Sequence, residues 1–500
     1  MAGDSPRRLL HKDGCDEDSG AYAECATPDN IDLQPTAKIE ASPETNELKV
    51  RQLDDTSVAI EVGNGPDRTD TSDGIRGAFP EIEWTVKTRT LRTCLVLAMP
   101  WAAYSILNTV FTNVRLSYME SMGISDFVPR FVPSLIQIFL GPILGAMSDR
   151  SLSKWGRRNV FLMAAAGIVT VSGLLFGSAN VLFPHLHSLT KLLLVLLSIG
   201  VLLLNIGLRA RIMDVVPIEF QVHAQATLAM YEGVGGVLGS LLFRSTTDAV
   251  VFASAISGED ILSAFSATMA AIFVSTAVSI YLRPENPQDK PAFQPRLGLV
   301  GREAWRQIVH APKVFRFLCL IYFVLSFAWL SFSDEVYQWW GGNVYGGCKT
   351  KGCDVDDQSD YKKGLDMANF ALISQNGLEA MICLVVLLIM PRVPDAYYLK
   401  RVAVLGLSIG AIALVIAVSV GRSCKQVAFT GFVATAFYHT VANVFPFSIV
   451  GIMGKELQIS ARRFNTDDTD TSDCSFNNNG LYIGVLMLFS AVSELTVQLV

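Results

Sequence analysis

Eleven apolar blocks, each long enough to cross a membrane as a helix, follow one another along most of this chain. A helix of about 20 apolar residues spans the hydrocarbon core of a bilayer. Only 17% of the residues are charged, and the mean hydropathy is +0.38, whereas soluble domains average about 25% charged residues. The sequence therefore predicts a polytopic membrane protein with spans at 93–113, 128–148, 159–180, 189–214, 222–243, 261–283, 314–340, 365–391, 398–421, 426–452 and 479–500.

Residues 1–85 have a different composition, rich in Asp, Glu, Ser, Thr and Pro and almost without apolar clusters. Such a segment buries too little apolar surface to offset the entropy of ordering it, so we expect a disordered acidic tail. The formal net charge of −6 offers no basic surface for phosphates, which excludes a nucleic-acid partner.

Lys and Arg gather in the loops that follow even-numbered spans, and such positive loops stay in the cytoplasm. These loops and the N-terminus are therefore predicted to be cytoplasmic. Cys348 and Cys353 then lie on the non-cytoplasmic side of the membrane. The sequence allows either a disulfide between them or two free thiols. The basic segments are Arg150 to Arg158, the linker 284–313, Arg392 to Arg401, and Lys455 to Arg463.

The loop between the second and third spans reads GAMSDRSLSKWGRR. Gly145 allows two helices to approach closely, and Asp149 at a helix end can pair with an arginine, so the segment is a candidate cytoplasmic gate. The alternative is a positive loop that only fixes topology. The candidate gate residues are Gly145, Asp149, Arg150, Gly156, Arg157 and Arg158, together with Asp214 at the end of the fourth span.

This G-x-x-x-D-R spacing followed by G-R-R resembles the signature of the major facilitator superfamily, and the S-D-R is similar to that of the sucrose:proton symporters of plants and their animal relatives. Five further blocks resemble that branch in the same order: LRARIMD, WWGGNVYGG, YKKGLDM, Pro446-Phe447 and GVLML. The resemblance covers about residues 95–500. One departure is Gln338, which stands where that branch has an aspartate.

The resemblance implies an all-α fold of two helical bundles related about an axis along the membrane normal. We expect an N-terminal six-helix bundle at 86–283, a cytoplasmic linker at 284–313 and a C-terminal bundle at 314–500. The second bundle has five predicted spans, so a twelfth helix is absent from the series.

Arg209 in the fourth span is the first candidate for substrate binding, with Asn205 four residues earlier on the same face. The resemblance places Arg209 where the family has an arginine tied to substrate recognition and proton coupling; a helix-end arginine that reaches for the interface is the alternative. Tyr104, Gln338 and Trp339 complete the predicted substrate site, although aromatic residues in spans also serve packing.

Three carboxylates are candidates for proton coupling, because an ionisable side chain at membrane depth is costly and faces a cavity or a partner. Glu232 and Glu379 lie near the middle of the fifth and eighth spans, and Asp334 lies one turn before Gln338. His439 and Asn443 form a polar face in the tenth span, where a hydrogen-bonded buried histidine and a proton relay are both open.

No phosphate-binding GxxxxGK[ST] loop, HExxH or GxSxG element and no Cys/His grouping with metal spacing occurs, so we expect neither an enzyme nor a cofactor other than the coupling proton. We predict a secondary transporter that moves a sucrose-like disaccharide, a glucoside or a hexose with protons by alternating access. The alternatives are a non-transporting sensor of the same fold and a carrier for another small solute. A monomer in the lipid bilayer is expected, in the plasma membrane in preference to a vacuolar or lysosomal membrane.

Overall fold

The structure, a computed structural model, describes residues 80–499 except 152, 154, 184, 252–257, 286–301, 303–304, 307, 334, 349–352, 392–395 and 465–477. The predicted tail up to residue 79 and most of the predicted linker lie outside these residues. Within the described part all regular elements are helical, in agreement with the predicted all-α fold.

The first half of the chain contains six long helices that match the first six predicted spans. They are α2 (Pro80–Ser121), α3 (Phe127–Asp149), α4 (Arg157–Gly177), α6 (His187–Val215), α7 (Gln221–Val251) and α8 (Gly258–Leu282), with the short α5 (Ala179–Leu182) and η1 (Ile218–Phe220) between them.

The second half departs from five uninterrupted spans at two places. The seventh predicted span is interrupted after α10 (Lys313–Ser333). The chain continues through α11 (Val336–Gln338) into the π-helical turn η2 (Trp339–Val344). The tenth span is divided at Thr435, whose hydroxyl donates to the Phe432 carbonyl at 2.6 Å. The other helices are α12 (Val355–Ile389), α13 (Ala396–Val420), α14 (Lys425–Ala434), α15 (Ala436–Phe464) and α16 (Asn479–Leu499).

Ten of the described helical segments are long and apolar enough to cross a membrane. The remaining predicted span, α7, has the length but carries His223, Gln225 and Glu232, which lower its hydropathy. Large apolar side chains such as Leu192 and Val404 are exposed on the outer helices, where lipid tails would cover them. The chain is an integral multi-pass membrane protein.

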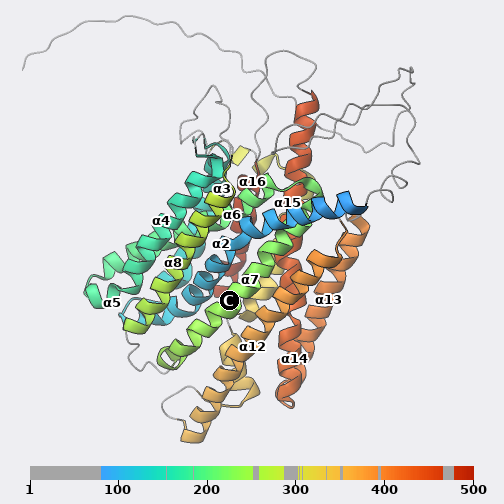
Figure 1. Cartoon of the computed structure of the whole chain (residues 1–500). Coiled ribbons are helices and arrows are strands. Elements are labelled where there is room, and N and C mark those ends of the chain that lie inside the picture. Colours follow the sequence, from blue (N-terminus) through green and yellow to red (C-terminus); the bar gives the residue numbers. More distant parts are fainter. Residues whose placement is uncertain are drawn as a thin grey trace, which may run out of the picture. The chain divides into compact units, whose positions relative to one another are not determined.

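The two halves meet most extensively along two helix pairs, α3 with α16 and α7 with α12 (Figure 1). Along the first pair the backbones nearly touch, because glycines face each other: a Cβ on Gly141 would lie 2.9 Å from the Gly484 carbonyl oxygen, and Gly145 faces Gly480 in the same way one turn on. Small residues four apart are a general means of close helix packing in membranes.

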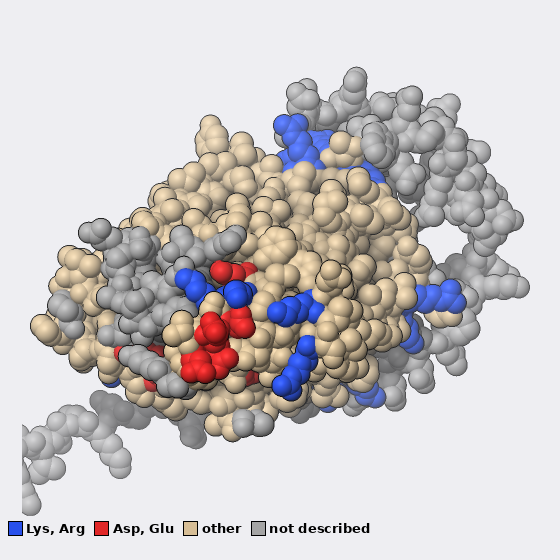
Figure 2. Space-filling model, turned by 90° about the horizontal axis from the view of Figure 1, so that it is seen from below, with Lys and Arg blue, Asp and Glu red and all other residues tan. Residues whose placement is uncertain are grey.

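Charged side chains are sparse at the end of the molecule where α12 begins. Figure 2 shows this end as a mostly uncharged surface, with an acidic cluster and several Lys and Arg side chains around it. Asp356 and Asp357 occupy the first turn of α12. Cys348 and Cys353, just before α12, form a disulfide, which is one of the two states left open by the sequence.

Candidate functional site

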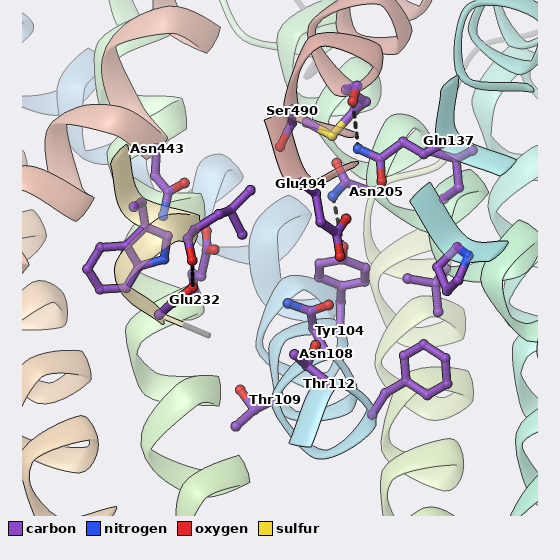
Figure 3. Close-up of a pocket in the computed structure, with 18 of the residues that line it drawn as sticks. Tyr104, Asn108, Thr109, Thr112, Gln137, Asn205, Glu232, Asn443, Ser490 and Glu494 are labelled. Atoms are coloured by element: carbon purple, nitrogen blue, oxygen red, sulfur yellow. Dashed lines mark hydrogen bonds between the residues drawn. The ribbon is translucent and has the colours of Figure 1, made fainter. Parts of the chain in front are cut away.

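A cavity of about 440 Å³ lies between the two halves, within the size range of small-molecule sites. Its walls come from α2, α3, α6 and α7 of the first half and from α10, α11, α12, α15 and α16 of the second. Figure 3 shows polar side chains pointing into it from both halves. Among those that line it are Tyr104, Asn108, Thr112, Gln137, Asn205, Glu232, Gln375, Asn376, Asn443, Ser490 and Glu494.

Arg209 is held at this cavity by groups from both halves. Its side chain is buried, and its Cζ lies 4.5 Å from the ring centroid of Trp101 and 3.7 Å from that of Phe447. Its Nη1 atom donates to Gln225 Oε1 at 3.3 Å and to the Asn443 carbonyl at 3.5 Å. The guanidinium is therefore in contact with two aromatic rings, an arrangement that favours arginine over lysine.

Glu232 lies beside Arg209 and is partly open to the cavity. Its Oε2 accepts a hydrogen bond from Trp101 Nε1 at 3.3 Å and lies 3.8 Å from Arg209 Nη2, with 24% of its side chain exposed. Contact with Arg209 compensates part of the cost of burying this carboxylate.

Asn205 and Tyr104 form a second polar contact in the wall. Asn205 Nδ2 donates to the Tyr104 hydroxyl at 2.8 Å, and Tyr104 packs against Trp101 with ring centroids 4.7 Å apart. Four predicted site residues, Tyr104, Asn205, Arg209 and Glu232, thus line one cavity.

Glu379 lies behind the cavity wall and is fully buried. Its Oε2 is 2.7 Å from His439 Nδ1, and its Oε1 accepts from Asn443 Nδ2 at 3.3 Å. His439 keeps 21% of its side chain exposed, and Asn443 lines the cavity. Asn443 joins the two charged groups, since its side chain bonds to Glu379 and its carbonyl bonds to Arg209.

The structure separates two predicted substrate residues from the cavity. Gln338 is exposed, and Trp339 packs with Trp340 and Phe432 in an aromatic cluster; neither lines the cavity, whereas the neighbouring Tyr337 does. The chain is interrupted after α10, and Gln338 and Trp339 belong to α11 and η2, which follow the interruption. Asp334 lies outside the described residues.

Several lining residues were not singled out as site residues from the sequence, among them Tyr322, Gln137 and Arg115. Tyr322 and Trp329 are seven residues apart on α10, so the helical period puts them on one face. That spacing could have indicated a shared aromatic face on this helix. Gln137 offers none, because a single Gln in a span is common to many environments.

Asp149 joins α3 to the first turn of α16. Its two carboxylate oxygens accept from the backbone N–H groups of Gly480 at 2.9 Å and Leu481 at 2.8 Å. It also forms an ion pair with Arg158, which donates to Ser148 as well. A carboxylate at a helix N-terminus is stabilised by the N–H groups that have no partner within the helix.

Asp214 extends this network to α15. Its Oδ2 lies 2.5 Å from Arg157 Nη2 and 2.8 Å from Arg158 Nε, while its carbonyl accepts from Lys455 at 2.7 Å. Asp214 therefore contacts the two arginines that begin α4. Arg211 instead donates to Ser279 Oγ at 3.0 Å.

The other predicted gate residues lie at the same end of α3. A Cβ on Gly145 would lie 2.7 Å from the Gly480 carbonyl carbon. Gly156 adopts a φ of 98°, which a side chain would strain, immediately before α4. Arg150 ends α3, its backbone N–H donating to the Met147 carbonyl. We call this end, closed by Asp149 and Asp214, the Asp149 end.

No protein-family model matches the sequence. Mouse solute carrier family 45 member 4 is 31% identical over 122 residues, which cover 22% of this chain and only 16% of that protein. XylE, a major facilitator superfamily proton:xylose symporter solved with 6-bromo-6-deoxy-D-glucose, aligns with a TM-score of 0.51 and 12% identity over 82% of this chain and 87% of XylE. The human organic anion transporter MFSD10 aligns with a TM-score of 0.47 and 14% identity over 82% and 91% of the two chains.

XylE is a transporter. At 12% identity the likeness to XylE supports the arrangement of the helices alone. It agrees with the two halves and the cavity between them. The chain has the two-bundle fold of the major facilitator superfamily.

Proposed function

We propose that this protein is a secondary transporter that carries a sugar together with protons by alternating access. The observation that supports it most directly is the polar chain Glu232–Arg209–Asn443–Glu379–His439, which crosses between the halves at the wall of the cavity. Burying an ionisable group at this depth is energetically costly, so such a group is taken as a candidate functional residue. The XylE structure adds support, because that protein is a proton:xylose symporter.

The charges around the cavity favour a neutral solute. Among the residues that the structure describes, the charged ones that line it are Arg115, Arg209, Glu232 and Glu494, and they form the two pairs Arg209–Glu232 and Arg115–Glu494. A charged solute would leave one partner of a pair uncompensated, which is costly. Neutral hydroxyl groups can bond to the amides and to Tyr104 without that cost. A sucrose-like disaccharide, a glucoside and a hexose all satisfy this requirement.

In the proposed cycle Glu379 and His439 hold the coupling proton, and Asn443 relays its arrival to Arg209. The positive-inside rule assigns the Asp149 end to the cytoplasm. In the described state the Asp149 end, and with it the cytoplasmic side in this scheme, is closed.

Uptake into proteoliposomes tests the proposal. With an inward proton gradient we expect labelled sucrose or glucose to accumulate above its equilibrium level, and to stop at equilibrium when a protonophore is added. Binding without accumulation would favour a sensor. Accumulation of a charged solute but of no sugar would contradict the inference of a neutral solute from the paired charges.

Glu379→Gln and Glu232→Gln should have different effects. Glu379→Gln removes the group assigned to the proton, so we expect stimulation by the gradient to disappear while exchange of labelled for unlabelled sugar continues. Glu232→Gln alters a cavity wall, so we expect a higher KM with stimulation retained. Initial rates at two pH values measure both, and equal gradient stimulation in parent and Glu379→Gln protein would contradict the assignment.

A further inference from the structure

A second ion pair joins two helices that line the cavity. Arg115 Nη2 on α2 lies 3.2 Å from Glu494 Oε1 on α16, with 15% and 22% of the two side chains exposed. Both residues line the cavity, and Gln498 donates to the same Glu494 oxygen at 3.4 Å. Figure 3 shows Glu494 pointing into the cavity beside Tyr104 and Asn205.

This pair lies toward the other end of α16 from Asp149. Asp149 holds residues 480 and 481, and Glu494 follows 13 to 14 residues later, which is about 20 Å along a helix. Between them Gln137 Nε2 of α3 donates to the Met487 carbonyl at 2.7 Å. Helix α16 of the second half is thus tied to the first half near both ends and in the middle.

The two end contacts differ in strength. Asp149 and Arg158 are almost fully buried and belong to a network with several hydrogen bonds. Arg115 and Glu494 are partly exposed and make a single ion-pair contact with each other. Fewer contacts must therefore break to separate this pair, so the Glu494 end is the weaker of the two closures.

We infer that Arg115 and Glu494 form a gate at the cavity end opposite Asp149, and that their separation admits the solute from that side. This gate rests on the alternating access proposed above. A pair that joins one helix of each half restricts their separation while it is formed, and it leaves two charged groups facing water when it breaks. Neither the Asp149 network nor the Arg209 contacts need to change for this step.

Labelling of a cysteine introduced at Ser490 tests the gate, because Ser490 lines the cavity one turn before Glu494. Purified S490C protein is treated with a hydrophilic thiol reagent, and the modified peptide is quantified by mass spectrometry, which separates it from the native cysteines. In this background we expect Glu494→Gln and Arg115→Gln each to raise the labelling rate about five-fold. The exchanged pair Arg115→Glu with Glu494→Arg should return the rate to near that of S490C alone.

The control is Asp360→Asn, which breaks the exposed Lys363–Asp360 pair on α12 and should leave labelling unchanged. Labelling of both single variants at the S490C rate would overturn the gate, as would an exchanged pair that labels as fast as the single variants. The exchanged pair decides the matter if a single variant unfolds, which thermal unfolding reports. Labelling does not require transport, so failure of the gate and failure of sugar uptake are separate results.

Discussion

Arg209→Lys is expected to lower gradient-driven sugar uptake by about 100-fold while the protein stays folded. A lysine at this position keeps the charge but loses the planar guanidinium that contacts the Trp101 and Phe447 rings and donates to Gln225 and Asn443. Two hydrogen bonds to a charged group, at about 1.5 kcal/mol each, account for a factor of that size. Initial uptake rates in proteoliposomes measure it.

Arg211→Lys is the matched control, two residues along the same helix. Arg211 is as deeply buried as Arg209, but its bonds go to Ser279 and to the carbonyl of Arg283 within the first half, and it does not line the cavity. This variant should lose thermal stability and keep the uptake rate per folded molecule. Equal losses of uptake in the two variants would mean that Arg209 acts through the fold alone.

The sequence was sufficient to predict the helices but not their interruptions. Apolar blocks of spanning length separated by polar loops determine where helices cross a membrane, because the backbone has no other way to satisfy its polar groups there. The division at Thr435 and the break after Ser333 both fall within predicted apolar spans. A Cβ on Gly341 in η2, for example, would lie 2.6 Å from Tyr361 of α12, which no local pattern indicates.

The candidate site was predictable to the extent that it depends on rare residues within spans. Arg209, Glu232 and Glu379 stand out because charge is uncommon at such depth. Their partners were not predictable, since Arg209 meets Asn443 and Phe447 from the other half of the chain. The helix N-terminus bound by Asp149 is likewise a tertiary contact, more than 300 residues away in sequence.

Asp149→Ala is expected to lower the free energy of unfolding by about 3–5 kcal/mol, because it removes one partner of a buried ion pair. It also leaves the N–H groups of Gly480 and Leu481 without their acceptor at the start of α16. The thermal unfolding midpoint in detergent should fall by several degrees. Asp360→Ala on α12, whose carboxylate is exposed and pairs only with Lys363 among the contacts described, should leave the midpoint unchanged.

A double-mutant cycle with Arg158→Ala identifies the source of this loss. If the Asp149–Arg158 pair carries it, the double variant is less destabilised than the sum of the two single variants, since neither charge is then left alone. Additive losses would instead assign the effect to the α16 N-terminus, which Asp149 contacts without Arg158. Because Arg158 also pairs with Asp214 at 2.8 Å, the single Arg158 variant should be the more destabilised of the two, and the reverse order would contradict the network described here.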